Sequence, residues 1–469
     1  MLLPNDDYPI HQTPLPLAHT MGGHPNAYDR FWFNAVSDSL VVAVALGLYP
    51  NRGVIDGAIA VVENGVQHSV FASDALIGRP TAVGPIRIEI VEPLRVNRIV
   101  IDAAEHGVVG ELTYEAATAT IEEPRQTMFD GERIFMDVTR ATQLGTWTGW
   151  VETPTGRHDI DGLPGTKDRS WGIRPVGEPL PGAPSQRAPQ IAFTWAPLLT
   201  ERGGVHVMHF DDANGRHLHH SAGVMPRNAE ARHVTGDLEI EWQPGTRWLA
   251  RASAFVENER YELEPVARFH MRGAGYSHPT FAHGRWHGGA QVASETLILA
   301  DLDPLDYHNV HVQHIVRVSG ADTGWGVGEQ VIIGPYAPAG TVVPVAFFAV
   351  TSVTVIGLFL SFMIPIWLRW RAGDKFIQGP WNLRNHWKWM CPVAVVEIIL
   401  VSIVFILPTN PGGVPWDPSF DLKLVQYAPI AILIVIGGAM LWWVLSARKW
   451  FTGPVSDVET PLDPHLLKD

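Results

Sequence analysis

The chain of 469 residues contains a single cysteine, Cys391. This scarcity excludes a disulfide framework and a metal site built from cysteine thiolates. The first ten residues, MLLPNDDYPI, lack the basic and apolar regions of a secretory signal peptide. No P-loop, HExxH or GxSxG motif occurs, and no helical pattern follows the glycines of GWGVG at 324–328. We therefore expect no phosphoryl transfer, no α/β-hydrolase chemistry and no cofactor.

Basic residues are scarce in the first part of the chain. Before residue 341 there are 25 Lys and Arg against 40 Asp and Glu, a charge of −15, whereas the remainder has 9 against 8. An acidic surface repels the phosphates of nucleic acids and anionic lipid headgroups. We therefore do not expect nucleic acid to be a partner.

Long apolar runs are absent from the first 340 residues, but three follow, at Val345–Leu368, Met390–Pro408 and Ala428–Ala447. Each is close to the length of about 20 residues that a helix needs to cross a bilayer. They predict a protein of the cell membrane with three spans. Five basic residues lie between the first two spans, which places this loop and the C-terminus in the cytoplasm. The first part of the chain would then lie outside, which conflicts with the missing signal peptide, so the side it occupies stays undecided.

Residues 30–336 alternate between apolar and polar side chains over short segments. Isoleucines alternate with Arg and Glu at 86–90, and similar patterns recur at 238–242 and 312–318. A period of two predicts half-buried antiparallel strands, and many short strands favour barrels or sandwiches. The predicted fold class is therefore mainly β, with two antiparallel barrels, followed by an all-α membrane segment. In chain order, we expect an N-terminal extension (1–24), a first barrel (25–177), a Pro-rich linker (178–189), a second barrel (190–337), a three-helix membrane region (343–459) and a tail (460–469).

The highest density of chemically active side chains lies in PGTKDRSWGIRP, residues 164–175. Its glycines and prolines predict a turn that holds Asp168, Arg169, Trp171 and Arg174. An acid beside a tryptophan at a cavity mouth has a raised pKa and can act as a general acid. The alternative is structural: Asp168 pairs with Arg169 or Arg174 and closes the linker between the two barrels.

Histidine is frequent, with 21 residues. His278 and His283 lie in a segment rich in glycine, and further groups occur at 217–220 and 308–314. A zinc or iron site needs three ligands that converge at about 2.1 Å. Alternation along a strand would turn His311 away from its two neighbours in the last group. We therefore predict hydrogen-bonding or cavity-lining roles and no metal site.

The first part of the chain resembles a known family in five segments, which are YDRFWFN (28–34), KDRSWGIR (167–174), FTWAP (193–197), GYSHPTFAHGRWHGG (275–289) and GVGEQVIIGPY (326–336). Residues 25–337 resemble the carotenoid 1,2-hydratase and AttH-like family, in particular its bacterial branch with two barrels. The resemblance implies tandem lipocalin-like barrels with an apolar cavity. Hydratases of this family protonate an isoprenoid double bond and add water without a cofactor.

The resemblance also suggests roles for individual residues. The acid candidates for such a reaction are Asp168, His278 and His283. The ligand-binding candidates are Trp171, Trp195, Tyr276 and Trp286, because aromatic faces stabilise carbocations as they bind other cations. Arg169 and Arg174 are assigned structural roles.

The last part of the chain resembles another family. Residues 346–383, which include GPWNL, resemble the tenth helix and following loop of bacterial amino-acid permeases of the amino acid–polyamine–organocation superfamily, and residues 414–430 and 442–455 resemble its last two helices. In that family the substrate binds at broken first and sixth helices, which have no counterpart here. Residues 343–459 should therefore not transport alone.

Glu397 lies within a span. A carboxylate there can be a proton or cation site. Alternatively, it faces a partner helix or becomes neutral in lipid.

These observations favour a membrane-anchored lipocalin-like protein that binds an isoprenoid, sterol or fatty lipid and is not an enzyme. One alternative is a cofactor-free hydratase or isomerase of an apolar alkene. Another is a permease-related transport protein that works with the missing helices. The expected partners are an apolar ligand, the bilayer, and a permease fragment or a second copy of the chain. The sequence leaves open whether the two parts act together or were joined by recombination.

Overall fold

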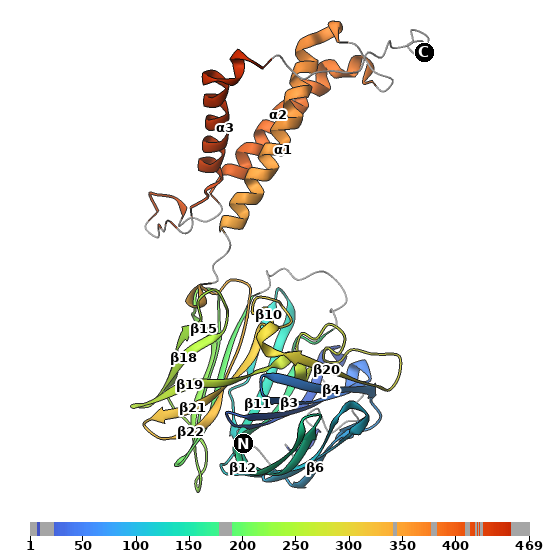
Figure 1. Ribbon diagram of the computed structural model, residues 1–469, viewed down its shortest axis with the longest axis vertical. Coiled ribbons are helices and arrows are strands. Elements are labelled where there is room, and N and C mark those ends of the chain that lie inside the picture. The colour runs from blue at the N-terminus through green and yellow to red at the C-terminus, as the bar shows by residue number, and fades with distance from the viewer. Residues whose placement is uncertain are drawn as a thin grey trace. The chain divides into compact units, whose positions relative to one another are not determined.

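The structure is a computed structural model that describes residues 7–9, 23–177, 190–340, 345–376, 382–408, 413–417, 420, 422 and 425–451. The predicted linker 178–189, the tail 460–469 and most of the extension 1–24 lie outside these residues. The chain divides into two compact units, Met1–Thr341 and Val342–Asp469 (Figure 1). We call them the first and the second unit and describe each by itself.

Two antiparallel sheets make up the described part of the first unit. The larger has 13 strands: β1 (Ala27–Val36), β2 (Leu40–Tyr49), β3 (Val54–Glu63), β4 (Val66–Ala75), β5 (Ala82–Val83), β6 (Ile86–Glu92), β7 (Val96–Ala103), β8 (Val108–Ala116), β9 (Ile121–Glu122), β10 (Gln126–Asp130), β11 (Arg133–Thr153), β12 (Gly156–Ile173) and β20 (Gln291–Ile298). The smaller has nine: β13 (Ile191–Thr200), β14 (Gly203–Asp211), β15 (His217–Pro226), β16 (Arg232–His233), β17 (Gly236–Trp242), β18 (Leu249–Val256), β19 (Glu259–His270), β21 (His311–Gly320) and β22 (Gly324–Ile333). The predicted fold class, mainly β with apolar helices at the end, is confirmed.

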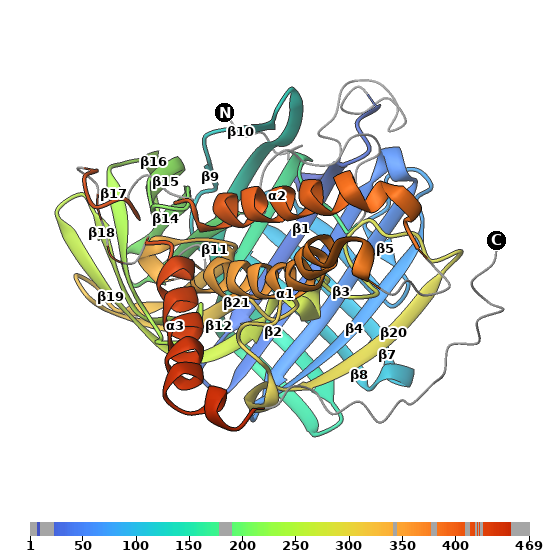
Figure 2. The same cartoon turned by 90° about the horizontal axis from the view of Figure 1, so that it is seen from above.

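The larger sheet follows the order β20-β4-β3-β2-β1-β12-β11-β8-β7-β6-β5, and β9 and β10 pair with β11. Its strands β1 to β4 lie side by side in Figure 2. Strand β20 comes from the region predicted as the second barrel, yet it pairs with β4, from Gln291 opposite Ser73 to Ile298 opposite Val66. The two predicted barrels therefore share one sheet.

Strands β1 and β2 show no alternation in their sequences, and every one of their residues is buried. On one face, Phe31, Phe33 and Val42 belong to the apolar core of the larger sheet. On the other face, Trp32 and Ala43 pack in a cluster that contains residues of the smaller sheet. A strand covered on both faces has no solvent side, and this explains the continuous apolar sequence of β2.

Residues 164–173 lie inside strand β12, so the predicted turn at 164–175 is wrong. Strand β12 pairs with β1 on one side and with β11 on the other. A Cβ atom on Gly165 would lie 1.9 Å from the carbonyl oxygen of Asn34 in β1. The glycine therefore marks a close approach of two backbones within a sheet, which a sequence does not distinguish from a turn.

The second unit contains the helices α1 (Val345–Ala372), α2 (Trp387–Ile406) and α3 (Ala428–Leu445). The segments Val350–Lys375, Arg384–Ile406 and Ala428–Lys449 are long and apolar enough to cross a membrane. Helices α1 and α2 pack side by side, and α1 also contacts α3 (Figures 1 and 2). Most of their apolar side chains are exposed, as expected for helices whose natural surroundings are lipid.

Candidate functional site

A cavity of about 780 Å³ lies within the first unit, with walls from both sheets. Strands β1, β11 and β12 of the larger sheet and β13, β14, β21 and β22 of the smaller one contribute residues, as does the segment between β19 and β21. The apolar part of the wall includes Tyr28, Trp32, Phe193, Trp195, Phe210, Met271, Val331 and Ile333. Charged side chains lie in the same wall, among them Arg140, Asp168, Arg174 and Glu329.

Six of the nine site residues predicted in the first unit line this cavity: Asp168, Arg174, Trp195, Tyr276, His278 and His283. The other three, Arg169, Trp171 and Trp286, are not among its lining residues. Strand β12 explains two of these outcomes, because alternate side chains of a strand point to opposite faces. Asp168 and Ser170 face the cavity, whereas Arg169 and Trp171 belong to the other face. Trp286 is half exposed.

Asp168 lies in the cavity wall with 13% of its side chain accessible, and it has no close partner. The Nε atom of Arg140 lies 3.8 Å from its Oδ1, and within the described residues Oδ1 has no hydrogen-bond partner. Burial raises the pKa of Asp168 to about 7, against the opposing charge of Arg140 and with a further increase from Glu123 and Glu329. A carboxyl with this pKa is partly protonated at neutral pH and can donate a proton.

The predicted ion pair of Asp168 with Arg169 or Arg174 is wrong. Arg169 contacts Asp29 at 2.6 Å on the opposite face of β12. Arg174 contacts Nδ1 of His283 at 3.1 Å. The cation beside Asp168 is Arg140, which comes from the neighbouring strand β11 and which sequence spacing gave no reason to select.

Arg140 is held by a second carboxylate, Glu123, which the sequence analysis also missed. Arg140 Nη1 donates a hydrogen bond to Glu123 at 2.9 Å, and the hydroxyl of Thr142 donates another at 3.1 Å. The indole N–H of Trp195 lies 3.3 Å from the same carboxylate. Burial acts to raise the pKa of Glu123, but Arg140 and His206 outweigh it and hold the pKa below its ordinary value. Glu123 is therefore ionised and fixes both Arg140 and Trp195 in the wall.

His283 is fully engaged in hydrogen bonds. Its Nδ1 accepts from Arg30 at 2.9 Å and from Arg174 at 3.1 Å, and its Nε2–H donates to the carbonyl oxygen of Ala274 at 2.8 Å. Burial and the two guanidinium charges lower the pKa of His283 well below its ordinary value. This arrangement makes His283 a neutral residue that positions the two arginines. Both arginines lie over the ring of Tyr276, at 4.5 and 5.2 Å from its centre.

His278 organises the loop in which it lies. Its Nδ1 accepts hydrogen bonds from the backbone N–H groups of Thr280 and Phe281 at 3.0 and 2.8 Å. Its ring packs against Phe71, with ring centres 4.6 Å apart. Among the three acid candidates, the geometry therefore favours Asp168.

Two further histidines, His308 and His311, line the cavity. Strand β21 begins at His311, so His308 is not part of the strand and the alternation rule does not separate the two. Nε2 of His311 lies 2.7 Å from Glu329, and Gln313 donates to the same carboxylate at 2.5 Å. His314 lies within the strand and its Nε2 accepts from the backbone N–H of Leu249, outside the cavity.

Glu397, predicted within a span, lies midway along α2 and is exposed in the second unit. Its exposure is compatible with both of the roles considered for it, an ion site or a contact to a partner helix.

Comparisons with known proteins bear on both units. The fold is similar to the crystal structure of a putative AttH from Nitrosomonas europaea, with a TM-score of 0.44 and 9% identity over 65% of this chain and 92% of that chain. It is also similar to kievitone hydratase from Nectria haematococca, with a TM-score of 0.38 and 13% identity over 66% of this chain and 91% of that chain.

Among curated proteins, the chain is 34% identical to the amino-acid permease BAT1 of Arabidopsis thaliana over 115 residues, which are 24% of this chain and 21% of the permease. The BAT1 homolog of Oryza sativa subsp. japonica is 32% identical over 120 residues, 24% of this chain and 21% of that protein. The chain thus spans about a fifth of the length of these relatives. The predicted resemblance to amino-acid permeases is confirmed. The profile of one family matches residues 2–342, and the chain therefore belongs to DUF8625, a family of unknown function.

Proposed function

We propose that the first unit binds an apolar molecule, of the isoprenoid, sterol or fatty-lipid class, and that the helices of the second unit anchor the protein in the cell membrane with three spans. The supporting observation is the cavity of about 780 Å³ between the two sheets. Its volume falls in the range of small-molecule sites, and aromatic and aliphatic side chains share its wall with many charged and polar ones.

The polar part of the wall indicates that the ligand has a polar end. Arg174 and Tyr276 lie together in the wall, and Arg140 lies beside Asp168. A hydroxyl or carboxylate on an otherwise apolar ligand can accept hydrogen bonds from these guanidinium groups. The aromatic side chains would then contact the apolar body of the ligand.

Anchoring is better supported than transport, because the chain spans about a fifth of the permeases that it matches. The apolar surfaces of α1 to α3 would contact lipid. They also offer a surface for a permease fragment or a second copy of the chain, which a transport role would require.

Retinol, a fluorescent isoprenoid alcohol, tests the binding proposal with full-length protein in detergent. Val331 lines the cavity and is only partly buried, so Val331→Trp should occupy part of the cavity and obstruct a ligand while the fold is retained. We expect this variant to bind retinol at least tenfold more weakly than the wild type. Trp286→Ala, which alters a half-exposed aromatic residue outside the lining, is the matched control and should bind normally. Equal binding by Val331→Trp and the wild type would contradict the proposal.

A second candidate function is hydration of an apolar alkene, and the state of Asp168 favours it. Its buried carboxyl, with a pKa of about 7, would protonate a double bond. The resulting carbocation would be stabilised by aromatic faces such as that of Trp195, and water would add with return of a proton to the carboxylate. Asp168→Asn should abolish hydration of a bound alkene and leave retinol binding unchanged. A product alcohol formed at the same rate by this variant would exclude Asp168 as the acid.

A further inference from the structure

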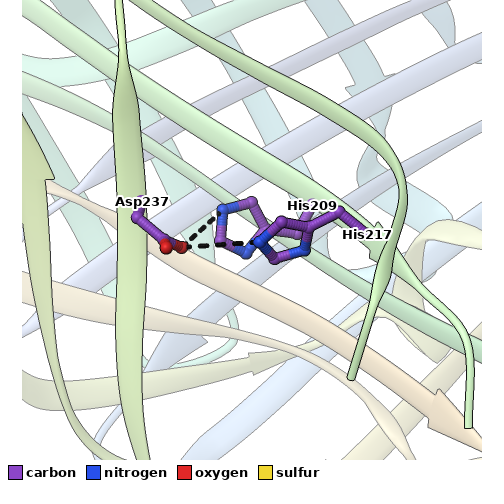
Figure 3. A group of neighbouring side chains, drawn as sticks. All are labelled: His209, His217 and Asp237. Atoms are coloured by element: carbon purple, nitrogen blue, oxygen red, sulfur yellow. Dashed lines mark ion pairs between the residues drawn. The ribbon is translucent and has the colours of Figure 1, made fainter. Parts of the chain in front are cut away.

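Three side chains outside the cavity converge on one point of the smaller sheet: His209 of β14, His217 of β15 and Asp237 of β17 (Figure 3). Nε2 of His209 lies 3.1 Å from Oδ1 of Asp237, and Nε2 of His217 lies 3.7 Å from the same oxygen. One donor atom from each residue lies within 4.8 Å of the other two. Donors of a tetrahedral zinc site with bonds of about 2.1 Å lie about 3.4 Å apart, close to the first two distances.

A β-bulge creates this convergence. In the ladder between β14 and β15, His209 lies opposite His220 and Phe210 opposite His219, but Asp211 lies opposite His217. The register shift skips Leu218, so His217 and His220 share a face although they are three positions apart. Bulges of this kind redirect a side chain, often beside functional sites. Strict alternation would have placed His217 and His220 on opposite faces, so the sequence pattern does not bring them together.

The imidazole of His217 is oriented as in known metal sites. Its Nδ1 lies 2.6 Å from Asp211, whose other carboxylate oxygen accepts a hydrogen bond from the Tyr336 hydroxyl at 2.7 Å. A histidine that donates one N–H to a carboxylate presents the lone pair of its other nitrogen, and metal-binding histidines are commonly fixed in this way. In His217 that other nitrogen is Nε2, which faces Asp237.

His209 supplies an independent indication. It is only 3% exposed, and its Nε2 has no hydrogen-bond partner among the described residues although Asp237 is near. A buried nitrogen without a partner costs free energy, and a metal ion at this point would satisfy it.

We propose that His209, His217 and Asp237 form a binding site for one divalent first-row transition metal ion, with zinc as the ion that best fits two imidazoles and one carboxylate. Such a set leaves at least one coordination position for water. Asp237 and His217 are partly exposed, with 60% and 38% of their side chains accessible, so the ion can enter from solvent.

The site would join two ends of the smaller sheet. Strand β17 is the last strand in the order β16-β15-β14-β13-β22-β21-β19-β18-β17, whereas β14 and β15 lie near its other end. Between these ends, Nε2 of His220 contacts the carbonyl oxygen of Gly236 at 2.7 Å. A bound ion would connect β17 to β14 and β15 through side chains. We therefore expect zinc to raise the temperature of thermal unfolding.

Untagged full-length protein in detergent, stripped with a chelator, allows the test, since a polyhistidine tag would bind the same ions. Zn²⁺ affinity is measured by competition with a chromophoric chelator, and Co²⁺ absorption reports the coordination geometry. His217→Ala and Asp237→Asn change exposed side chains and should leave the circular dichroism spectrum unchanged. His158→Ala is the matched control, because His158 is similarly exposed (32%) and also contacts a carboxylate, Glu63, at 2.7 Å elsewhere in the unit.

We expect the wild type and His158→Ala to bind one Zn²⁺ with micromolar or tighter affinity. His217→Ala and Asp237→Asn should each bind at least tenfold more weakly and lose the zinc-dependent rise in unfolding temperature. Asp211→Asn, which alters the carboxylate behind His217, should weaken binding about 10-fold or more. Equal affinity in all variants, or millimolar binding by the wild type, would overturn the proposal. If Fe²⁺ bound more tightly than the usual order of affinities for divalent transition metals predicts, the three ligands would stand and iron would be their ion in place of zinc.

Discussion

The Nε atom of Arg140 lies 3.8 Å from Oδ1 of Asp168, within reach of an ion pair but too far for a hydrogen bond. The guanidinium group is instead hydrogen-bonded to Glu123. Glu123 and Asp168 therefore both interact with the guanidinium group of Arg140, and the interaction with Asp168 is the weaker one. This distance explains why burial dominates the pKa of Asp168 and why the cavity wall contains a carboxyl that titrates near neutral pH.

The first prediction concerns the pH dependence of stability. The pKa of Asp168 is about 7 in the folded state and about 4 in an unfolded chain. The favourable contribution of its protonated form is therefore complete below about pH 4 and is lost as the pH rises through 7. Asp168→Asn, which cannot ionise, should stabilise the first unit at pH 8 by on the order of 2–4 kcal/mol and have little effect at pH 4. Denaturant titration at the two pH values measures this difference.

Asp159→Asn is the control for this experiment, because the Asp159 side chain is 80% exposed. Its effect on stability should be small at both pH values. If Asp168→Asn had the same effect at pH 4 and pH 8, the raised pKa would be incorrect.

The second prediction concerns Arg140 and its partner. Arg140→Gln leaves Glu123, whose side chain is 2% exposed, without its cation. Removing one partner of a buried ion pair costs about 3–5 kcal/mol, and we expect a loss of this size in the free energy of unfolding. The double variant Arg140→Gln/Glu123→Gln should recover much of the loss, because no buried charge then remains unpaired.

Arg157→Gln provides the comparison, since Arg157 and Asp159 form an exposed pair. We expect a change below about 1 kcal/mol. A double variant as unstable as Arg140→Gln alone would argue against coupling between Arg140 and Glu123.

The third prediction concerns the close approach of β12 to β1. A Cβ atom on Gly165 would clash with the carbonyl oxygen of Asn34, which belongs to the backbone and has little room to move. Gly165→Ala should therefore lower the free energy of unfolding by about 3 kcal/mol or more. At Gly328 a Cβ atom would first meet the end of the Leu249 side chain at 3.2 Å, so Gly328→Ala should be tolerated better. Similar denaturation midpoints for the two variants would refute this packing argument.

The fourth prediction concerns membrane association. Helices as apolar as α1, α2 and α3 should hold the full chain of 51.7 kDa in the membrane fraction of cells. The protein should resist extraction with alkaline carbonate, which removes peripheral proteins, and dissolve in detergent. Immunoblotting of the fractions with an antibody against the first unit measures this. Recovery of the full-length protein in the carbonate supernatant would be incompatible with spanning helices.

Local sequence patterns predicted the elements of this protein well. The isoleucines at 86–90 alternate with charged residues and form β6, where Ile86 and Ile88 are fully buried. The three apolar runs coincide with α1, α2 and α3 to within a few residues at most ends. These features depend on neighbours in the chain, and a period of two or an uninterrupted apolar run is visible in the sequence alone.

The sites depended on residues brought together from distant parts of the chain. The sequence pointed to Asp168, but only the pairing of β11 with β12 placed Arg140 beside it and assigned Trp171 to the opposite face. Likewise, the register shift between β14 and β15 put His217 next to His209. The sequence by itself thus determined the helices, the strands with alternating apolar residues and the residue types available, whereas it predicted a turn inside β12. The tertiary structure decided which of them meet, because strand order and a one-residue bulge leave no periodic signal in the sequence.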